Sequence, residues 1–325
     1  MSASPQPLVS RTPDQVLLGD LLHSLSAQAE FINSSLLKWV LRLVMVGLGL
    51  SLTAADFKRV LVYPKAVSLG LLAQIIGQPL LGFGLALLFG VPPAIAIGLV
   101  ILSACPSGVT ANAYTFASRA DVPLCITLSA LTSISTVFTI PFFINLGLRT
   151  FEIGGALPPL PASRMLLELI GFTIVPLAIG MIVRASFPAF AGRTVEPIRK
   201  SVFYLMIFVL VLGGVASYES ILAHFAAAGA LVVTMNVLSM GAGYGLARLF
   251  RLPTAQVVTL TFEVGVHNLA LALTVIYTML KRPDLAATVL LYAVVMPATA
   301  LAFVAFAKRL MAEEERRTVA ARRVA

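Results

Sequence analysis

Residues 254–277 read TAQVVTLTFEVGVHNLALALTVIY, and this stretch decides the fold. It is apolar over about the 20 residues that a helix needs to cross a bilayer. Yet it contains Glu263, His267 and Asn268, although an ionisable group at the centre of a membrane helix costs about 2.5 to 3.5 kcal/mol on insertion scales. The stretch contains no lysine or arginine that could pair with the carboxylate. Glu263 therefore marks a functional site for an ion or a proton.

The composition indicates an integral membrane protein. Of the 325 residues, 59% are hydrophobic and 11% are charged, whereas soluble domains carry about 25% charged residues. The lysines and arginines behind the net charge of +9 lie in loops and at the C-terminal end, which favours a topology signal over nucleic-acid binding. Cys105 and Cys125 lie in apolar stretches without metal-ligand spacing, so neither a disulfide framework nor a zinc site is expected.

Nine apolar segments are long enough to cross a bilayer as helices. They cover residues 34–52, 66–89, 94–117, 122–147, 164–186, 201–217, 226–248, 254–280 and 285–307. Each is a continuous run, unlike the ten-residue alternating pattern of a barrel strand, so an all-α membrane fold is predicted.

Three parts of the chain are distinguished. Residues 1–33 form a polar N-terminal lead, residues 34–307 the transmembrane transporter domain, and residues 308–325 a basic tail. The charges of the lead do not suit a cleavable signal peptide, and a short interfacial helix is expected over residues 15–29. The tail is interpreted as a solvated helix end, with a contact to membrane lipid as the alternative.

The basic residues predict the orientation in the membrane. If the spans alternate in direction, most lysines and arginines fall on one side, together with the tail. Because cytoplasmic loops collect Lys and Arg, the N-terminus is expected outside and the C-terminus in the cytoplasm. The protein is then a multi-pass protein of the inner (plasma) membrane.

Two of the nine spans are interrupted in a similar way. The segment 94–117 contains Pro106 and Gly108, and the segment 254–280 contains Gly265 beside its polar cluster. Proline removes a helix donor, so main-chain carbonyls are freed near the middle of the membrane. Matching interruptions in two halves that run in opposite directions are typical of inverted-repeat transporters whose site lies at the midplane.

The polar residues near these interruptions suggest an ion site. A carboxylate such as Glu263 with freed carbonyls makes a hard oxygen cage, which suits an alkali cation. His267 lies one helical turn away and can carry a proton, so a proton is the alternative coupling ion. Asn112 and Asn268 each follow an interruption and can offer an oxygen to a cation or bond across helices.

Two smaller groups of residues keep two interpretations open. Thr110 and Ser129, each taken alone, suit packing between membrane helices, and Gln74 is a midspan amide open to either role. A serine in a Ser-Gly turn, Ser107, together with His267 could form the dyad of an intramembrane serine hydrolase, which is a remote alternative.

Three stretches resemble a known family. LSACPSGVTANAYTFASRADVPLCITLSALTSIST at 102–136 and LTFEVGVHNLALAL at 260–273 resemble the two crossing motifs of the bile acid:sodium symporter family, and SLTAADFKRVLVYPKAVSLGLLAQ at 51–74 extends the similarity. The resemblance implies a core domain with two discontinuous helices that cross at the membrane centre, and a panel domain that moves against it. It implies a secondary transporter and not an enzyme, with no cofactor besides sodium as the coupling ion.

The resemblance also implies ligands for two sodium ions. Glu263 would be the carboxylate shared by both sites, with Asn112 and Ser129 at the first site. The second site would use the Gln74 side chain and the carbonyls of Val264 and Val266. His267 is also expected to take part in ion binding.

This sequence departs from the family pattern at four positions. Ala111 and Cys125 stand where the family has serines, His267 stands where it has a glutamine, and CPSG stands for CPGG. Alanine offers no oxygen and a thiol is a poor sodium ligand, so the first site would be weakened. Sodium and proton coupling both remain open, as does a uniporter or exporter whose ion sites have decayed.

The expected solute is a small organic anion. Thr110 and Asn268 near the crossing, with Tyr292, Met296 and Thr299 of the last span, are the expected substrate-binding residues. The N-termini of the crossing helices favour an anionic group through their backbone dipoles. The other expected partner is membrane lipid, and no pattern indicates an oligomeric state.

Overall fold

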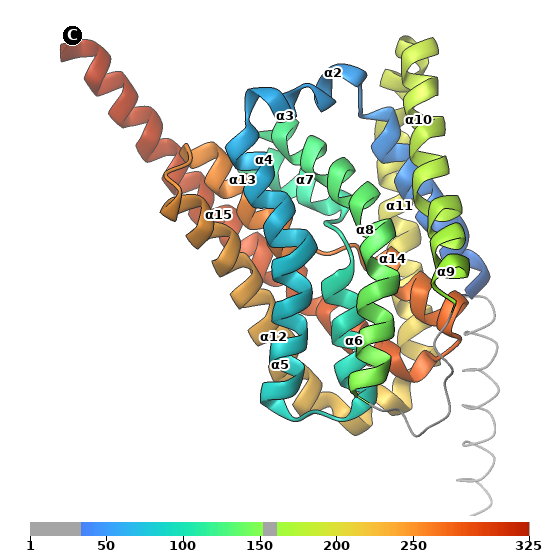
Figure 1. Cartoon of the computed structure of the whole chain (residues 1–325). Helices are drawn as coiled ribbons and strands as arrows, with labels where there is room; N and C mark the ends of the chain where they lie inside the picture. The colour runs from blue at the N-terminus through green and yellow to red at the C-terminus, as the bar shows by residue number, and fades with distance from the viewer. Residues whose placement is uncertain (1–33, 152–160, 325) are drawn as a thin grey trace, which may run out of the picture.

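The computed structural model describes residues 34–151 and 161–324, and these residues form helices joined by short connections (Figure 1). Their one isolated β-bridge pairs Ser107 with His267. The predicted all-α class is confirmed for the described residues. The interfacial helix expected over residues 15–29 lies outside them.

Most of the described residues lie in helices, and three of the α-helices begin at a proline. The bounds are α2 (Ala54–Phe57), α3 (Arg59–Val62), α4 (Pro64–Leu72), η1 (Ala73–Gly77), α5 (Gln78–Phe89), α6 (Pro93–Ala104), α7 (Val109–Ala117), α8 (Val122–Thr150), α9 (Ala162–Leu169), η2 (Ile170–Ile174), α10 (Val175–Ser186), α11 (Pro188–Ala216), α12 (Tyr218–Leu249), α13 (Thr254–Gly265), α14 (Leu269–Thr274), η3 (Val275–Leu280), η4 (Pro283–Leu285) and α15 (Ala286–Val324). Pro64, Pro93 and Pro188 each open a helix, where the missing N–H would have no partner in any case.

Six described helices are long and apolar enough to cross a membrane. They are Pro64–Phe89, Val122–Thr150, Ala162–Ser186, Pro188–Val215, Ala228–Leu249 and Pro283–Arg316. A seventh is counted if Ser34–Leu50 and Ala54–Val62, bent by 82° relative to each other, form one span. The two spans predicted at 94–117 and 254–280 are each divided into shorter helices, so they do not pass as continuous spans. The count of nine stays a prediction.

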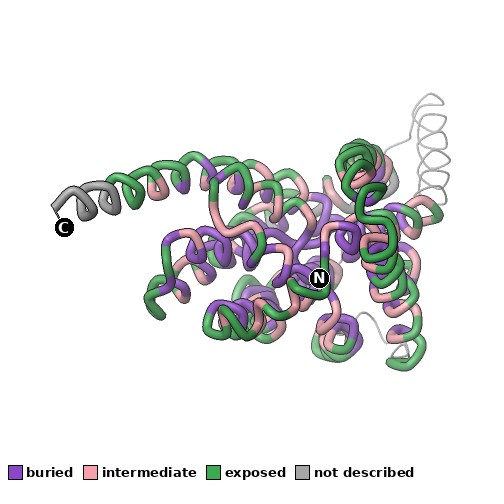
Figure 2. Tube along the Cα trace, turned by 90° about the horizontal axis from the view of Figure 1, so that it is seen from above, coloured by how far each residue is buried: buried purple, intermediate pink, exposed green. Residues whose placement is uncertain are grey.

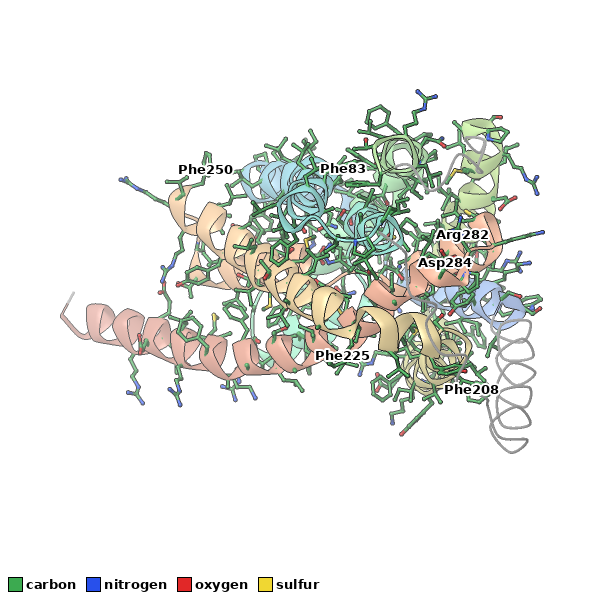
Figure 3. The ribbon with its side chains drawn as sticks, turned by 90° about the horizontal axis from the view of Figure 1, so that it is seen from below. Phe83, Phe208, Phe225, Phe250, Arg282 and Asp284 are labelled. Atoms are coloured by element: carbon green, nitrogen blue, oxygen red, sulfur yellow. The ribbon has the colours of Figure 1, made fainter. Side chains whose placement is uncertain are left out.

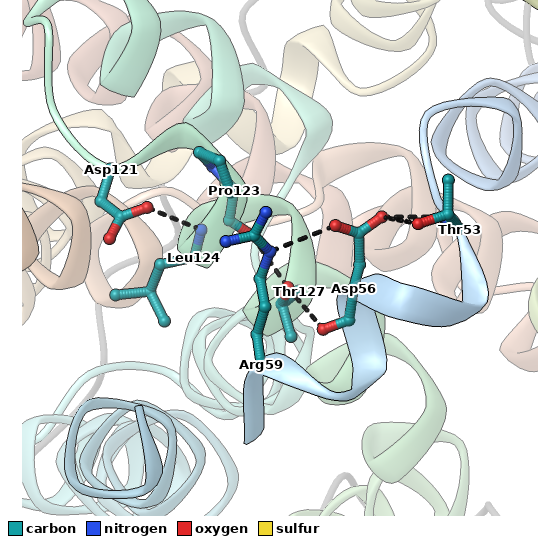
Figure 4. Close-up of polar contacts among 7 residues, drawn as sticks. All are labelled: Thr53, Asp56, Arg59, Asp121, Pro123, Leu124 and Thr127. Atoms are coloured by element: carbon teal, nitrogen blue, oxygen red, sulfur yellow. Dashed lines mark hydrogen bonds and ion pairs between the residues drawn. The ribbon is translucent and has the colours of Figure 1, made fainter. Parts of the chain in front are cut away.

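The bend after Ser34–Leu50 is stabilised by a small polar cluster (Figure 4). The backbone N–H and hydroxyl of Thr53 both donate to Asp56 Oδ2, at 2.8 and 2.7 Å, and Arg59 Nε donates to Asp56 Oδ1 at 3.2 Å. Thr127 of α8 donates to the Asp56 carbonyl at 3.3 Å. These contacts join the turn to α8.

Two groups of helices make up the bundle. The helix Ser34–Leu50 lies beside α9, α10 and α11 on one side of Figure 1. A Cβ on Gly49 would lie 2.2 Å from the Leu177 carbonyl oxygen, and a Cβ on Gly180 would lie 2.4 Å from that of Val46. Only glycine allows so close a helix crossing. The remaining helices form the larger group, which contains both divided spans.

Burial increases toward the centre of the bundle (Figure 2), and many large apolar side chains are exposed on its outside. Phe208, Phe225 and Phe250 are 51%, 60% and 43% exposed, and they lie on the periphery in Figure 3. An apolar exterior around a buried polar centre is expected of a multi-pass membrane protein. The ion pair of Arg282 with Asp284, in the connection before α15, is also labelled there, with a 2.7 Å hydrogen bond.

The last helix is longer than the span predicted for it. Residues 308–324 of the predicted tail continue α15 without interruption, and the helix projects away from the bundle (Figure 1). The tail is thus helical as far as Val324.

Candidate functional site

The two divided spans meet through their breaks. Between α6 and α7, and between α13 and α14, the chain is extended, and the two extended segments pair in antiparallel fashion at Ser107 and His267. The N–H of Gly108 donates to the Val266 carbonyl at 3.2 Å, and the N–H of Asn268 donates to the Pro106 carbonyl at 2.8 Å. Four half-helices therefore point at one buried place.

This pairing frees main-chain oxygens. In a continuous helix, the N–H of Gly108 would bond the carbonyl of Ala104, and that of Asn268 would bond the carbonyl of Val264. Both donors are used across the break instead. The carbonyls of Ala104 and Val264 are consequently without their helical donors in the interior, where a bare carbonyl is costly.

Glu263 lies at this crossing and is 3% exposed. Ser107 Oγ donates to its Oε2 at 2.6 Å, and Ser129 Oγ donates to its Oε1 at 2.6 Å. The Cys125 thiol lies 2.9 Å from Oε1 and also accepts from Thr115 at 3.2 Å. None of the ion pairs found in the described part of the chain includes Glu263. A buried carboxylate surrounded by neutral donors needs a cation or a proton to balance its charge.

Two amides near the crossing have one unused oxygen each. Gln74 lies in the π-helical turn η1 and donates from Nε2 to the Cys105 carbonyl at 2.8 Å, next to the first break. Its Oε1 and the Oδ1 of Asn112 are buried without a hydrogen-bond partner. An unpaired buried polar atom costs about 1–3 kcal/mol, and a bound cation would satisfy such oxygens.

The polar residues after Glu263 make separate contacts. His267 Nδ1 lies 3.1 Å from the Tyr292 hydroxyl, and the two rings meet edge to face with centroids 5.5 Å apart. Asn268 caps α14, because its Oδ1 accepts from the Leu271 N–H at 3.1 Å. His267 Nε2 and Asn268 Nδ2 are buried and without a partner.

The structure brings together several predicted ion-site residues. Ser129 contacts Glu263 directly, and the Val266 carbonyl accepts from Gly108 in the paired breaks. Within the described part of the chain, no hydrogen bond joins Asn112 or Gln74 to the carboxylate, although each has a buried unpaired oxygen. Their roles as ligands stay predictions.

The predicted substrate residues lie in different surroundings. Thr110 is exposed, whereas Tyr292 and Met296 are buried at 0% and 3% exposure. The Tyr292 hydroxyl is used in hydrogen bonds, and Thr299 donates to Asn236. A cavity of about 420 Å³ lies elsewhere, between α8 and α9. A substrate role for these residues stays a prediction.

One residue of this region was missed from the sequence. Asn236 of α12 is fully buried and donates to the Gly265 carbonyl at 3.0 Å. The signal was present, since Asn236 interrupts the apolar run VVTMNVLSM at 232–240. Asparagine within a membrane helix bonds to another helix or lines a pathway.

Comparison with known proteins identifies similar transporters. The model of the Sodium Bile acid symporter family matches residues 39–224. The chain is 25% identical over 268 residues to the probable sodium/metabolite cotransporter BASS2, chloroplastic, of Oryza sativa subsp. japonica, which covers 81% of this chain and 62% of that protein. It is 30% identical over 262 residues to the P3 protein of Homo sapiens, and the aligned region covers 78% of this chain and 54% of that protein.

A bacterial relative is matched over more of its own length. The uncharacterized sodium-dependent transporter YocS of Bacillus subtilis (strain 168) is 28% identical over 253 residues, which cover 73% of this chain and 74% of that protein. By contrast, the chain spans only 62% and 54% of the rice and human relatives.

Proposed function

This chain belongs to the Sodium Bile acid symporter family, and from that premise we propose that it is a secondary transporter that moves a small organic anion with sodium by alternating access. The observation that carries the proposal is the buried carboxylate of Glu263, which lies where two helix breaks meet and is surrounded by Ser107, Cys125 and Ser129. Coupling means that the ion raises the affinity for the anion in one conformation, and the anion raises that for the ion.

The chemistry of the donor set supports sodium as the coupling ion. Glu263, two hydroxyls and the freed Val264 carbonyl are hard oxygen ligands, which alkali cations prefer. The hydroxyls of Ser107 and Ser129 can rotate so that their lone pairs face a cation. The unpaired oxygens of Gln74 and Asn112 add two further ligands nearby. Relatives are named sodium/metabolite cotransporter and sodium-dependent transporter.

The departures from the family pattern favour the second sodium site over the first. Ala111 is fully buried and has no side-chain oxygen, and Cys125 presents sulfur to the carboxylate. Both belong to the expected first site. The expected second site keeps Glu263, Gln74 and the carbonyls of Val264 and Val266. We expect one sodium ion to bind, at this second site.

The two breaks support an inverted-repeat architecture. α6 and α13 each have 12 residues, each follows a proline N-cap, and each ends in a short extended segment before a second half-helix. The antiparallel pairing of the extended segments fits two repeats of opposite direction. Counting each divided span once gives nine crossings. The helix Ser34–Leu50 with α9–α11 would form the moving panel and the remaining helices the core.

Helix N-termini at the crossing support the organic anion, and the distribution of basic residues supports the orientation. The N-termini of α7 and α14 point at the crossing and offer N–H groups to an anionic group. The excess of basic residues on the side of the C-terminal helix supports a cytoplasmic C-terminus, an external N-terminus and a plasma-membrane location.

Proton coupling is the second candidate function. It is favoured because His267 stands where the family has a glutamine. A proton on Glu263 would also neutralise the buried carboxylate without requiring a full oxygen cage. The hydrolase alternative has less support. Ser107 Oγ donates to Glu263 Oε2, while the His267 ring contacts Tyr292, so no described Ser–His hydrogen bond activates a nucleophile.

The test is uptake by purified protein in proteoliposomes. A set of radiolabelled organic anions is offered with an inward sodium gradient, with potassium in place of sodium, and with an inward proton gradient alone. Sodium-driven uptake that persists when a protonophore removes the proton gradient supports the proposal. Uptake driven by the proton gradient in potassium shows proton coupling. Equal uptake under all conditions shows an uncoupled carrier.

A further inference from the structure

A second polar cluster surrounds the Gly265 carbonyl at the second break, and its member Asn236 has no role assigned so far. Asn236 Nδ2 donates to the Gly265 carbonyl at 3.0 Å and to the Tyr292 hydroxyl at 2.9 Å. The Tyr292 hydroxyl also lies 2.9 Å from the Gly265 carbonyl oxygen and 3.1 Å from His267 Nδ1. Asn236, Tyr292 and His267 are 0%, 0% and 1% exposed. The three side chains are therefore buried within the bundle in this conformation.

The close approach of α12 to α13 puts Asn236 in this place. Asn236, Met240 and Gly243 follow one another at spacings of four and three on one face of α12. A Cβ on Gly265 would lie 2.2 Å from Met240 Cγ, and a Cβ on Gly243 would lie 2.6 Å from the Leu260 carbonyl oxygen. The two helices thus touch through their glycines, and the short Asn236 side chain reaches the carbonyl at the end of α13.

The orientation of the Asn236 amide follows from its neighbours. Thr299 Oγ1 donates to Asn236 Oδ1, so the oxygen of the amide faces α15. Both protons of Nδ2 are then used, one on the Gly265 carbonyl and one on the Tyr292 hydroxyl.

A count of protons fixes the state of the histidine ring. Two oxygens only 2.9 Å apart, those of Tyr292 and Gly265, repel each other unless a proton lies between them. The protons of Asn236 point along other directions, so the hydroxyl proton of Tyr292 must lie on this line. Tyr292 therefore cannot donate to His267, and the contact of 3.1 Å requires that His267 Nδ1 carries the proton.

The other ring nitrogen is left bare in the neutral ring. His267 Nε2 is buried and has no hydrogen-bond partner, and in the Nδ1–H tautomer it offers a lone pair. The neighbouring Asn268 has an unused donor instead. Its Oδ1 caps α14, and this leaves its Nδ2 without a partner. The second break thus presents one unused acceptor beside one unused donor.

We propose that Asn236 and Tyr292 are positioning residues that hold His267 in the Nδ1–H tautomer, so that Nε2 accepts a hydrogen bond from a hydroxyl or N–H group of the transported solute. An imidazole nitrogen is a softer ligand than oxygen, so it is a poor ligand for sodium. Its lone pair can instead accept a hydrogen bond. The tautomer stands on the geometry alone. Only the part concerning the solute rests on the proposed function.

The tautomer is tested by nitrogen-15 NMR of the full chain, labelled at histidine and reconstituted in lipid bilayers at alkaline pH. The chain has 3 histidines, and His267→Gln identifies the signal of interest. The expected result is a protonated Nδ1 and an unprotonated Nε2. Tyr292→Phe, which removes the hydroxyl that accepts the Nδ1 proton, is expected to move the population toward the Nε2–H form. Asn236→Ala is expected to do so more weakly.

A matched control separates positioning from general destabilisation. Ser239 lies on the same helix, is fully buried and donates to Gln78 Oε1 at 2.7 Å. Ser239→Ala loses a buried hydrogen bond of α12 but should leave the His267 signals unchanged. An Nε2–H tautomer in the unmodified protein overturns the assignment without any variant. An unchanged tautomer in a folded Tyr292→Phe protein overturns the positioning role.

The solute part is tested on the anion that the uptake screen identifies. In the unmodified protein, an analogue that lacks the hydroxyl or N–H group should need at least a tenfold higher concentration than the parent anion to inhibit uptake by half. In His267→Phe this ratio should be less than twofold. A transported anion without any hydrogen-bond donor overturns this part. Failure of sodium to drive uptake would instead contradict the proposed function and leave the NMR result standing.

Discussion

The hydroxyl of Ser107 donates to the carboxylate of Glu263 over 2.6 Å, although the two residues are 156 positions apart in the sequence. This bond joins the break of the first divided span to the end of the half-helix before the second. Any movement that separates the two breaks must therefore change the surroundings of the carboxylate. An ion bound at Glu263 would hold them together, which is how an ion site can control access to a solute site.

Glu263→Gln is expected to abolish sodium-driven uptake while the protein still inserts and folds, because the amide is neutral and keeps the shape of the side chain. The measurement is uptake into proteoliposomes, together with thermal unfolding of purified protein in sodium and in potassium. At a sodium concentration about 100 times the dissociation constant, binding adds about 2.7 kcal/mol of stability. The variant should lose this difference.

Glu168→Gln serves as the control for the loss of a carboxylate. Glu168 lies in α9 and pairs with Arg164 at 3.1 Å on the exposed surface. Such pairs contribute at most about 1 kcal/mol, so its sodium dependence should match that of the unmodified protein. Sodium-dependent uptake by the Glu263→Gln protein would contradict the assigned ion site.

Cys125→Ser is expected to raise the affinity for sodium, because a hydroxyl replaces a thiol 2.9 Å from the carboxylate. The half-saturating sodium concentration should fall by about tenfold, which corresponds to about 1.4 kcal/mol. Cys105→Ser is the matched control, since Cys105 is equally buried and its thiol has no described contact with Glu263. If both serines shift the value equally, the effect is not specific to the site.

Gln74→Leu is expected to weaken sodium binding and to destabilise the protein by about 1–3 kcal/mol, since the Cys105 carbonyl would lose its 2.8 Å donor. Gln78→Leu, one turn along the same span, also removes a buried amide but one that bonds Ser239. Both variants should lower the melting temperature. Only Gln74→Leu should raise the half-saturating sodium concentration, and an equal rise in both would exclude Gln74 as a ligand.

Gly265→Ala is expected to lower the melting temperature strongly, because its Cβ would lie 2.2 Å from Met240 Cγ. Overpacking of this kind typically costs about 1–3 kcal/mol. Adding Met240→Ala should restore part of the loss by removing the nearest atom. Gly245→Ala in α12 meets nothing within 4 Å and should be neutral or slightly stabilising. A neutral Gly265→Ala would show that α12 and α13 are less tightly packed than described.

Asp56 is expected to add a small pH-dependent contribution to stability. Partial burial acts to raise its pKa, but the hydrogen bonds from Thr53 and Arg59 outweigh this and hold the pKa below the usual value of an aspartate. A carboxylate with a depressed folded-state pKa stabilises the fold above its unfolded pKa and loses that effect as the pH falls through the folded value. Asp56→Asn should therefore lower stability by under about 1 kcal/mol at neutral pH. The difference from the unmodified protein, measured by thermal unfolding, should shrink as the pH falls below about 4 and disappear below the depressed folded-state pKa. A difference that persists there would show that packing and not charge is responsible.

Periodicity and hydropathy were sufficient for the broad fold. The apolar runs, the interrupting Pro106 and Gly265, and the isolated Glu263 predicted membrane helices with two breaks, and the structure contains helix ends at Ala104 and Gly265. The helix limits were less predictable. The segment predicted at 201–217 begins at Pro188 in the structure, because hydropathy marks the part suited to the bilayer, whereas the backbone continues as a helix until a residue ends it.

The sequence by itself determined the class of molecule, the positions of the breaks and the buried carboxylate, because these depend on local composition and on residues that cannot continue a helix. Only the tertiary structure decided which side chains surround that carboxylate. Ser107, Cys125 and Ser129 reach Glu263, and Asn236 with Tyr292 reaches Gly265 and His267, through helix crossings that bring together residues far apart in the chain. Hydrogen bonds depend on distances of a few tenths of an ångström and on direction, and no spacing along one chain specifies them.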